Sequence, residues 1–338
     1  MSNPHDHFFR ETFSRREVAV DFVRHYLPPE VVAQLDLAAL HVVKDSFVDP
    51  ELREHFADLL YRTRLQDGQD AYVYVLFEHK SHPEPLVAFQ LLRYLVRIWE
   101  QVLKQNELTH LPPIVPVIVY HGAEAWRIAV HFRGLFVDRP ALAEFIPDFR
   151  YQLCDLSDYS DEEIAGKALL RVALLILKHI FDGELRTRLP DILSLMDELA
   201  QARSGLEYLE IVLRYVTAAA PGLSTADLKE AVEEAFPQVG GALMATIAQT
   251  WVEQGIAQGF AQGIEQGVKQ GVERGVRRGV LQEAREAVFD ILEARFTTVS
   301  PIVVTIIATI DDPLRLKRLR KRALTVASLA EFEQLLKV

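Results

Sequence analysis

Three charged residues, Asp58, Glu78 and Lys80, are of the types that metal-dependent phosphodiester cleavage requires. Two carboxylates supply the hard oxygen ligands that Mg²⁺ prefers. A lysine beside them can orient the attacking water and offset the negative charge that develops on the phosphate. The set suggests hydrolysis of a nucleic-acid backbone, with Asp58 and Glu78 as metal ligands and all three as catalytic residues.

The local pattern puts Glu78 and Lys80 at the end of a buried strand. The almost wholly apolar run Tyr72–Phe77 gives way abruptly to Glu-His-Lys-Ser-His. Because side chains alternate along a strand, Glu78 and Lys80 should share one face. The pair Asp67-Gly68 favours a hairpin turn, which would bring Asp58 opposite them. The spacing alone leaves open an ordinary polar strand end, since an Asp and an ExK triplet also occur together by chance.

The elements that must position these residues form an α/β arrangement between about residues 37 and 156. Near-continuous apolar runs predict strands that are covered on both faces. A strong helix over residues 86–103 separates two of them, and this order implies a mixed sheet flanked by helices. The predicted strands are Leu40–Phe47, Phe56–Leu65, Ala71–Phe77, Ile114–Tyr120 and a shorter edge candidate, Tyr151–Cys154. Residues 1–36 and 157–250 are predicted to be helical.

The composition is that of a globular protein, with 49% hydrophobic and 25% charged residues among 338. The net charge of −11 excludes a uniformly basic nucleic-acid coat but leaves room for a local cationic groove. The single cysteine, Cys154, cannot form an intrachain disulfide, and the apolar runs are too short to span a bilayer. We therefore expect a soluble cytoplasmic protein with no membrane partner.

Five sequence blocks follow one another in a fixed order: His5–Phe13, Ala57–Tyr61, Tyr72–Ser81, Phe89–Trp99 and Pro112–Gly122. Together they resemble the recombination-promoting nuclease (Rpn) family, also known as YhgA-like transposases. The resemblance covers about the first 155 residues closely and the rest more loosely. It implies a PD-(D/E)xK restriction-endonuclease-like fold and a DNA endonuclease that depends on Mg²⁺ (or Mn²⁺). It also implies a role in DNA recombination or in defence against mobile elements.

The resemblance assigns roles residue by residue. Asp58 matches the family's metal-binding aspartate, and Glu78 matches the glutamate of its ExK motif. Lys80 matches the last position of that motif, where many relatives have Gln, so lysine is closer to the general nuclease pattern. Gln90 and Tyr94 resemble the Q-x-x-x-Y motif of RecB-like nucleases.

Three secondary candidates have simpler interpretations as well. Gln90 and Tyr94 share a helix face and could touch metal-bound water or DNA. Alternatively, Gln90 lies at the surface and Tyr94 packs in the core. Asp6 could supply a further carboxylate, but an N-cap before an apolar helical run is the favoured interpretation.

The histidines His5, His7, His79, His82 and His121 raise the alternative of an HD-type phosphohydrolase, since His/Asp pairs bind transition metals. The additional His and Asp residues that such a site needs are not identifiable in the sequence. A regular strand would also point His79 away from Glu78 and Lys80. A histidine metal site is therefore disfavoured.

Glycine recurs at every fourth residue from Gly255 to Gly279, and an apolar residue follows each glycine. Glycine costs a helix about 1 kcal/mol per site, which close contact with another helix would offset. A period of four drifts by about 40° per repeat, so the partner helix must cross or wind with a right-handed sense. We predict a helix over 251–283 that pairs with a copy of itself, giving a homo-oligomer, most simply a dimer. A flexible linker is the alternative.

Four segments are expected: a PD-(D/E)xK nuclease-like domain at 1–156, a helical region at 157–250, the repeat helix at 251–283 and a C-terminal helical segment at 284–338. The last segment holds a basic run, Arg315–Arg322. This run could contact phosphates, or it could form a solvated helix face with Leu316 and Leu319 packed inward. Asp311-Asp312 followed by Pro313 predicts a helix start.

A metal-dependent DNA endonuclease is the leading hypothesis, with dimerisation placing two sites on one duplex. One alternative is a non-catalytic DNA-binding or assembly module that retains the nuclease fold. A weaker alternative is a transposase that acts by strand transfer, although no helix-turn-helix or zinc motif is apparent for recognising DNA ends.

Overall fold

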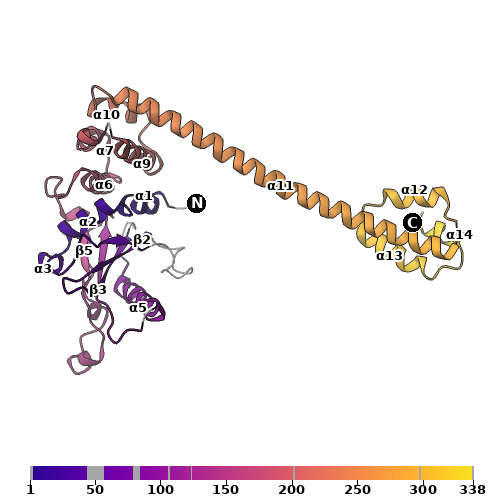
Figure 1. Cartoon of the computed structure of the whole chain (residues 1–338), viewed down its shortest axis with the longest axis horizontal. Helices are drawn as coiled ribbons and strands as arrows, with labels where there is room; N and C mark the ends of the chain where they lie inside the picture. Colours follow the sequence, from indigo (N-terminus) through magenta and orange to yellow (C-terminus); the bar gives the residue numbers. More distant parts are fainter. Residues whose placement is uncertain are drawn as a thin grey trace. The chain divides into compact units, whose positions relative to one another are not determined.

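The computed structural model describes residues 3–43, 57–78, 84–105, 107–122, 124–200, 202–296 and 298–336. The chain divides into two compact units, Met1–Ile247 and Ala248–Val338, which are considered separately (Figure 1). Among the described residues, no helix combines the length and the hydropathy needed to span a bilayer.

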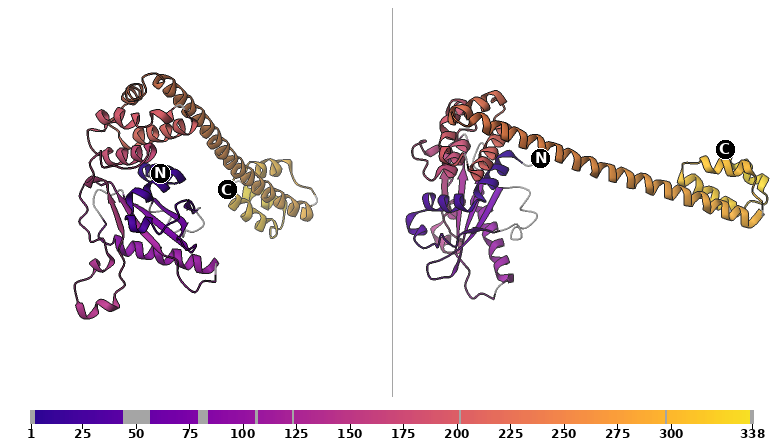
Figure 2. Two further views of the ribbon diagram at one scale, coloured as in Figure 1. Left: turned by 60° about the vertical axis from the view of Figure 1, so that its left-hand side comes forward. Right: turned by 45° about the horizontal axis from the view of Figure 1, so that its top comes forward.

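A five-stranded mixed sheet with the order β1-β2-β3-β4-β5 is the centre of the first unit (Figure 2). β2 pairs with β1 and β3 in antiparallel fashion, whereas β3, β4 and β5 are parallel. The strands are β1 (His41–Val42), β2 (Ala57–Arg64), β3 (Asp70–Glu78), β4 (Ile114–Tyr120) and β5 (Gln152–Asp155). The predicted mixed sheet is therefore present, and the described part of its first strand is short.

The turn at Asp67-Gly68 joins β2 to β3, as the sequence predicted. Gly68 has a φ of 89°, in a region that residues with a Cβ rarely adopt. The Asp67 side chain accepts a hydrogen bond from the Gln69 amide at 3.0 Å, a local bond typical of turns. This turn fixes the register of the hairpin.

Helices cover both faces of the sheet (Figure 1). On one face, α5 (Val87–Gln105) shares a core with Leu76 and Tyr120. On the other, the Tyr61 hydroxyl donates to the Phe13 carbonyl at the end of α1 (Pro4–Phe13), at 2.9 Å. The predicted helical start of the chain is divided into three helices, because α2 (Arg16–Tyr26) and α3 (Pro29–Val32) follow α1 after short breaks.

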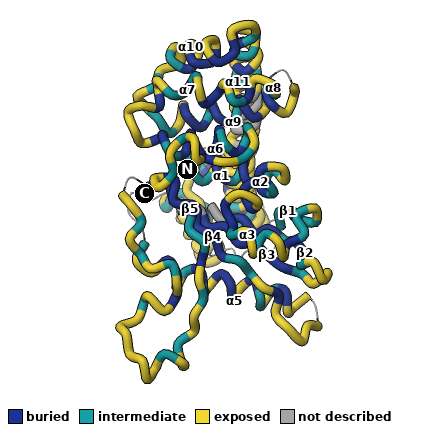
Figure 3. The backbone as a smooth tube through the Cα atoms, turned by 90° about the vertical axis from the view of Figure 1, so that its left-hand side faces the viewer, coloured by how far each residue is buried: buried dark blue, intermediate teal, exposed yellow. Residues whose placement is uncertain are grey.

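The helices after β5 pack onto the α/β part, so both belong to one unit (Figure 3). Tyr215 of α9 stacks on Phe8 of α1 with ring centroids 4.2 Å apart. These helices are α6 (Ala168–His179), α7 (Leu185–Ser194), α8 (Asp197–Ala200), α9 (Arg203–Ala219) and α10 (Thr225–Ala235). Among the described residues, short 3-10 helices precede them: η2 (Phe132–Leu135), η3 (Pro140–Phe145) and η4 (Leu156–Asp158).

The glycine repeat lies within α11 (Gly240–Phe296), a single helix of 57 residues. The end of α11 packs with α12 (Pro301–Thr309), α13 (Pro313–Ala323) and α14 (Leu329–Leu336). Their core includes Val288, Ile307 and Phe332. Asp312 caps α13 by accepting from the Leu314 amide at 2.8 Å, which is the predicted helix start.

Candidate active site

The register of the sheet gives Asp58 and Glu78 neighbouring positions on one face. Asp58 pairs with Leu76 across the β2–β3 ladder, and Glu78 lies two residues farther along β3. Residues directly opposite in an antiparallel pair, and residues two apart in a strand, belong to the same face. The side chains of Asp58 and Glu78 and the whole of Lys80 lie outside the described residues, so their roles remain predictions.

This part of the sheet is the edge at which the parallel strands end. Glu78 pairs with Tyr120, the last residue of β4, and Tyr120 pairs with Asp155, the last residue of β5. The carboxyl edge of parallel strands is the common location of ligand sites in open α/β sheets. β2 begins at the same edge with Ala57, so Asp58 and Glu78 both lie there.

Asp155 also lies at this edge, but its carboxylate already accepts three hydrogen bonds within the fold. It accepts hydrogen bonds from the Ser157 amide at 3.0 Å, the Ser157 hydroxyl at 2.7 Å and the Trp126 amide at 3.1 Å. The side chain is buried, and these bonds tie the segment after β4 to the end of β5. Asp155 therefore has a structural role beside the candidate site.

Tyr94 anchors α5 to the same face of β3. Its side chain is 3% exposed, and its ring centroid lies 5.1 Å from that of Tyr74. Tyr74 is two residues before Leu76 and four before Glu78, so all three positions share a face. The core interpretation of Tyr94 is confirmed by this burial, and Tyr94 also holds α5 against the strand that carries Glu78.

The direction of α5 puts Gln90 nearer than Tyr94 to the Glu78 end of β3. The indole of Trp99, in the later half of α5, donates to the Pro112 carbonyl at 2.9 Å. Residue 113 in turn accepts from the amide of Tyr72, at the beginning of β3, at 3.0 Å. The last turns of α5 therefore lie beside the beginning of β3, and its first turn lies near the end of β3. Gln90 is one turn before Tyr94 along α5 and is thus nearer to that end.

The amide nitrogen Nε2 of Gln90 is buried and has no hydrogen-bond partner among the described residues. Buried polar groups nearly always have a partner, because an unsatisfied one costs free energy. An unsatisfied donor on this helix face is a suitable group for contacting a bound anion or solvent. The carboxylate oxygens expected from Asp58 and Glu78 are likewise suitable ligands for Mg²⁺. Asp58 and Glu78 are of the residue types that bind Mg²⁺, and metal binding by them stays a prediction.

Asp6 does not cap α1, so the favoured interpretation of this residue was wrong. The cap is Asn3, whose side chain accepts from the His5 amide at 3.0 Å, and Pro4 begins the helix. Proline is favoured at the first helical position, which puts the cap one residue before it. Asp6 lies in the first turn of α1, which packs on the opposite face of the sheet from α5.

Two of the histidines belong to an aromatic cluster on the side of the sheet that α1 covers. His5 Nδ1 lies 2.7 Å from the Tyr215 hydroxyl, and the ring of buried His121 lies 5.4 Å from that of His5. His79 and His82 lie outside the described residues. Within the described part of the chain, no three or more His, Cys, Asp or Glu residues are arranged to hold a metal ion.

A charged network in the helical part was not predicted from the sequence. The buried imidazole of His179 lies between two carboxylates, 2.9 Å from Asp161 and 2.5 Å from Asp182. Asp161 also accepts from Lys178 at 2.6 Å and from Arg188 at 2.9 Å. No sequence signal indicates this network, because Asp161 is 17 or more residues from its three cationic partners.

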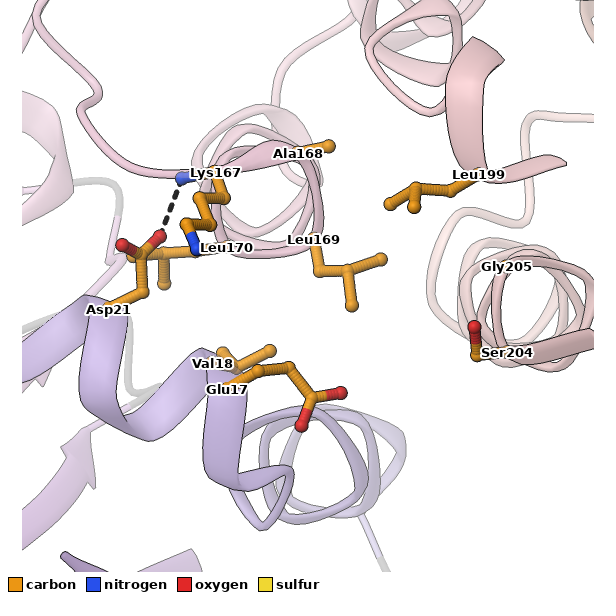
Figure 4. Close-up of a pocket in the computed structure, with 10 residues that line it drawn as sticks. All are labelled: Glu17, Val18, Asp21, Lys167, Ala168, Leu169, Leu170, Leu199, Ser204 and Gly205. Atoms are coloured by element: carbon orange, nitrogen blue, oxygen red, sulfur yellow. Dashed lines mark hydrogen bonds between the residues drawn. The ribbon is translucent and has the colours of Figure 1, made fainter. Parts of the chain in front are cut away.

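A cavity of about 250 Å³ lies elsewhere in the unit, between α2, α6 and α9 (Figure 4). Its lining is mainly apolar, with Val18, Leu169 and Leu170 among the residues involved. At one side, the Asp21 carboxylate accepts from the Lys167 amide, just before α6, at 2.5 Å. Gln90 is not among the described residues that line this cavity.

A family profile described as "Putative transposase, YhgA-like" matches residues 3–207. The chain belongs to this family. The match to the YhgA-like family spans the sheet, α5 and the helices up to α9, and it confirms the membership predicted from five blocks.

The YhgA-like chain is also similar to proteins of Escherichia coli K12. The recombination-promoting nuclease RpnC is 29% identical over 255 residues, which cover 75% of this chain and 82% of RpnC. RpnA, also a recombination-promoting nuclease by name, is 28% identical over 259 residues, which cover 75% of this chain and 85% of RpnA. The inactive recombination-promoting nuclease-like protein RpnE is 30% identical over 185 residues, which cover 54% of this chain and 61% of RpnE. No solved structure matches.

Proposed function

We propose that this YhgA-like protein is a metal-dependent DNA endonuclease that uses Asp58, Glu78 and Lys80. The observation that carries the proposal is the β2–β3 register, which gives Asp58 and Glu78 neighbouring positions at the carboxyl edge of the sheet. The names of RpnC and RpnA, recombination-promoting nucleases, support the reaction class. We further propose that the reaction serves DNA recombination or defence against mobile elements in the cytoplasm, within a PD-(D/E)xK fold.

Each residue of the proposed site has a distinct task. Asp58 and Glu78 would hold Mg²⁺ or Mn²⁺, which acts as a Lewis acid toward the phosphate. Lys80 would orient the attacking water and add positive charge where negative charge develops. Gln90 would donate its buried amide to a phosphate or solvent oxygen, and Tyr94 would hold α5 so that Gln90 stays in place.

We propose in addition that two copies of the chain pair through α11. The apolar residues that follow the glycines are exposed in the single chain, for example Val268 at 60% and Val276 at 61%. A Cβ added at any of six glycines of the repeat would meet no atom within 4 Å. A second α11 would bury the apolar stripe and offset the low helix propensity of glycine. A dimer would bring two active sites to one duplex.

Calorimetric titration of Mg²⁺ into the metal-free full-length protein tests this assignment. Binding is expected in the wild-type protein and in Glu107→Gln, a charge-matched change at an exposed position outside the proposed site. Glu78→Gln should abolish the heat of binding, because it removes a ligand charge. In parallel, Mg²⁺ should support cleavage of closed circular DNA, whose lack of ends excludes exonuclease action, and EDTA should stop it.

Two relatives are named as inactive, and their names keep open the alternative of a non-catalytic module with the nuclease fold. A folded protein that binds DNA but neither takes up metal nor cleaves would be a DNA-binding or assembly module on the same fold. Joined rather than cleaved products would instead support a strand-transferring transposase.

A further inference from the structure

Helix α13 presents a dense group of cations to solvent. Its eleven residues include six Lys or Arg and no acidic residue. Leu316, Leu319 and Ala323 are buried in the core of the second unit. The opposite side of α13 carries the exposed residues of what we call the basic face: Lys317, Arg318, Lys321 and Arg322.

The cations of the basic face repel one another. Lys317 and Lys321, and likewise Arg318 and Arg322, are four residues apart and therefore adjacent on the helix surface. Same-sign pairs at this spacing destabilise a helix. None of the ion pairs among the described residues includes a member of the basic face. Asp311, an acidic residue just before α13, pairs with Arg285 at 2.7 Å. An external polyanion would relieve this repulsion.

The two units differ in charge. Residues 248–338 hold 13 Lys or Arg and 11 Asp or Glu, which gives a formal net charge of +2. Residues 1–247 hold the other 24 Lys or Arg and the other 37 Asp or Glu, which gives −13. The unit with the candidate active site therefore repels polyanions on average. The other unit has a positive net charge, and four of its 13 cations form the basic face.

We propose that the basic face of α13 is a DNA-anchoring site that binds the phosphate backbone of duplex DNA. The choice of DNA as the polyanion rests on the proposed endonuclease function. Contacts from Lys and Arg to phosphates are independent of base sequence and release condensed counterions. The anchor adds affinity for duplex DNA to a chain whose other unit has a net charge unfavourable for DNA binding.

The packing of α13 argues against an anionic membrane as the partner. A helix that binds at a membrane surface buries its apolar side among the lipids. The apolar side of α13 is already occupied, because Leu316 is 0% and Leu319 is 5% exposed within the unit's own core. From Lys317 onward, every exposed residue of α13 is a Lys or an Arg, and such a surface suits a polyanion such as a nucleic-acid backbone.

The test is the salt dependence of DNA binding by the full-length chain, measured by fluorescence anisotropy in EDTA so that cleavage cannot intervene. The probe is a labelled duplex of about 30 base pairs, at salt concentrations from roughly 50 to 300 mM. Each phosphate neutralised contributes about 0.9 to the slope of log K against log salt. Changing all four residues of the basic face to Gln should lower that slope by about 3 to 4 and weaken binding by roughly tenfold or more.

A matched variant separates local contacts from total charge. It removes four exposed cations of the first unit by substituting Gln at Arg24, Arg139, Arg203 and Lys229. This control should retain nearly the wild-type slope. Equal losses in the two variants, or no loss in the basic-face variant, would overturn the anchor. Loss of binding to anionic vesicles, with DNA binding intact, would overturn it too.

The outcome is separable from that of the proposed cleavage. If the basic-face variant loses DNA binding but the wild-type protein never cleaves DNA in Mg²⁺, the anchor stands and the endonuclease assignment fails. Circular dichroism of the variant should show an unchanged helix content, because the substitution removes repulsion and leaves Leu316 and Leu319 in place.

Discussion

Gln90 has a buried amide nitrogen without a described partner, on the helix face that covers the strand of Glu78. We expect Gln90→Met to reduce DNA cleavage by roughly tenfold or more, because it removes the donor that we propose contacts a phosphate or solvent oxygen. The same change should leave the free energy of unfolding unchanged or slightly increased, since no described hydrogen bond is lost. Cleavage assays and urea unfolding measure the two effects.

Gln105→Met is the control for this expectation, because Gln105 is an exposed residue at the other end of the same helix. It should leave both quantities at their wild-type values. If Gln90→Met instead destabilised the fold while cleavage per folded molecule stayed constant, Gln90 would be a structural residue.

Asp161 provides a residue-level prediction about pH. Burial raises the pKa of its carboxyl, but hydrogen bonds from Lys178 and His179, together with their charges, outweigh burial and lower the pKa. A carboxyl with a lowered folded pKa stabilises the protein above its unfolded pKa of about 3.9. That contribution is lost as the pH falls through the lower, folded pKa.

Asp161→Asn should therefore destabilise the protein by about 1–3 kcal/mol at neutral pH, because it leaves the mostly buried Lys178 and His179 without their carboxylate. The difference from wild type should shrink as the pH falls from about 5 to 3. Thermal unfolding across this range measures both effects, with Asp191→Asn as an exposed control. A constant difference at all pH values would show that the charge of Asp161 is not what stabilises the network.

At the scale of elements, α11 offers a test of helix pairing. Each Gly→Ala change at Gly267, Gly271 and Gly275 should favour the isolated helix by up to about 1 kcal/mol, since nothing lies within 4 Å of the added Cβ. If a second helix approaches this stripe, the same triple variant should associate more weakly. We expect higher helix stability by circular dichroism and weaker association by sedimentation.

Gly222→Ala serves as the control, because its added Cβ also meets no atom within 4 Å and the position lies outside the repeat. Unchanged self-association of the triple variant would contradict close packing of glycine against a partner.

The elements that could be predicted from the sequence are those with local signals. The β2–β3 hairpin followed from two apolar runs and the turn pair Asp67-Gly68, and its register then fixed the positions of Asp58 and Glu78. The cap of α1 was missed by three residues, although Asn3 followed by Pro4 is itself a capping signal.

Features that depend on tertiary contacts could not be predicted. The orphan amide of Gln90 depends on how α5 lies on β3, and helical spacing alone allowed it to face solvent. The engaged carboxylate of Asp155 depends on Trp126, which is 29 residues away along the chain. Sequence periodicity carries no information about either packing arrangement.

At the scale of the whole molecule, self-association should determine whether one or both DNA strands are cut. Val268 and Val272 are about 60% exposed in the single chain, so changing both to Glu should not disturb its fold. The change should prevent burial of the apolar stripe and yield a monomer. We expect that variant to nick plasmid DNA, whereas the wild-type protein, if it dimerises as proposed, should also produce linear DNA early in the reaction.

Gel quantification of nicked and linear products, beside sedimentation of the same samples, checks this prediction. Early linear product from a protein shown to be monomeric would contradict the need for two copies.

The most direct measurement of the central claim is the rate at which purified full-length protein nicks supercoiled plasmid in Mg²⁺, beside the Asp58→Ala and Asp138→Ala variants. Asp138 is an exposed carboxylate outside the proposed site. We predict cleavage by the wild-type protein and Asp138→Ala, abolition by EDTA, and a loss of at least about 100-fold in Asp58→Ala. Cleavage that persists in Asp58→Ala, or no cleavage by a folded wild-type protein, would contradict the assignment.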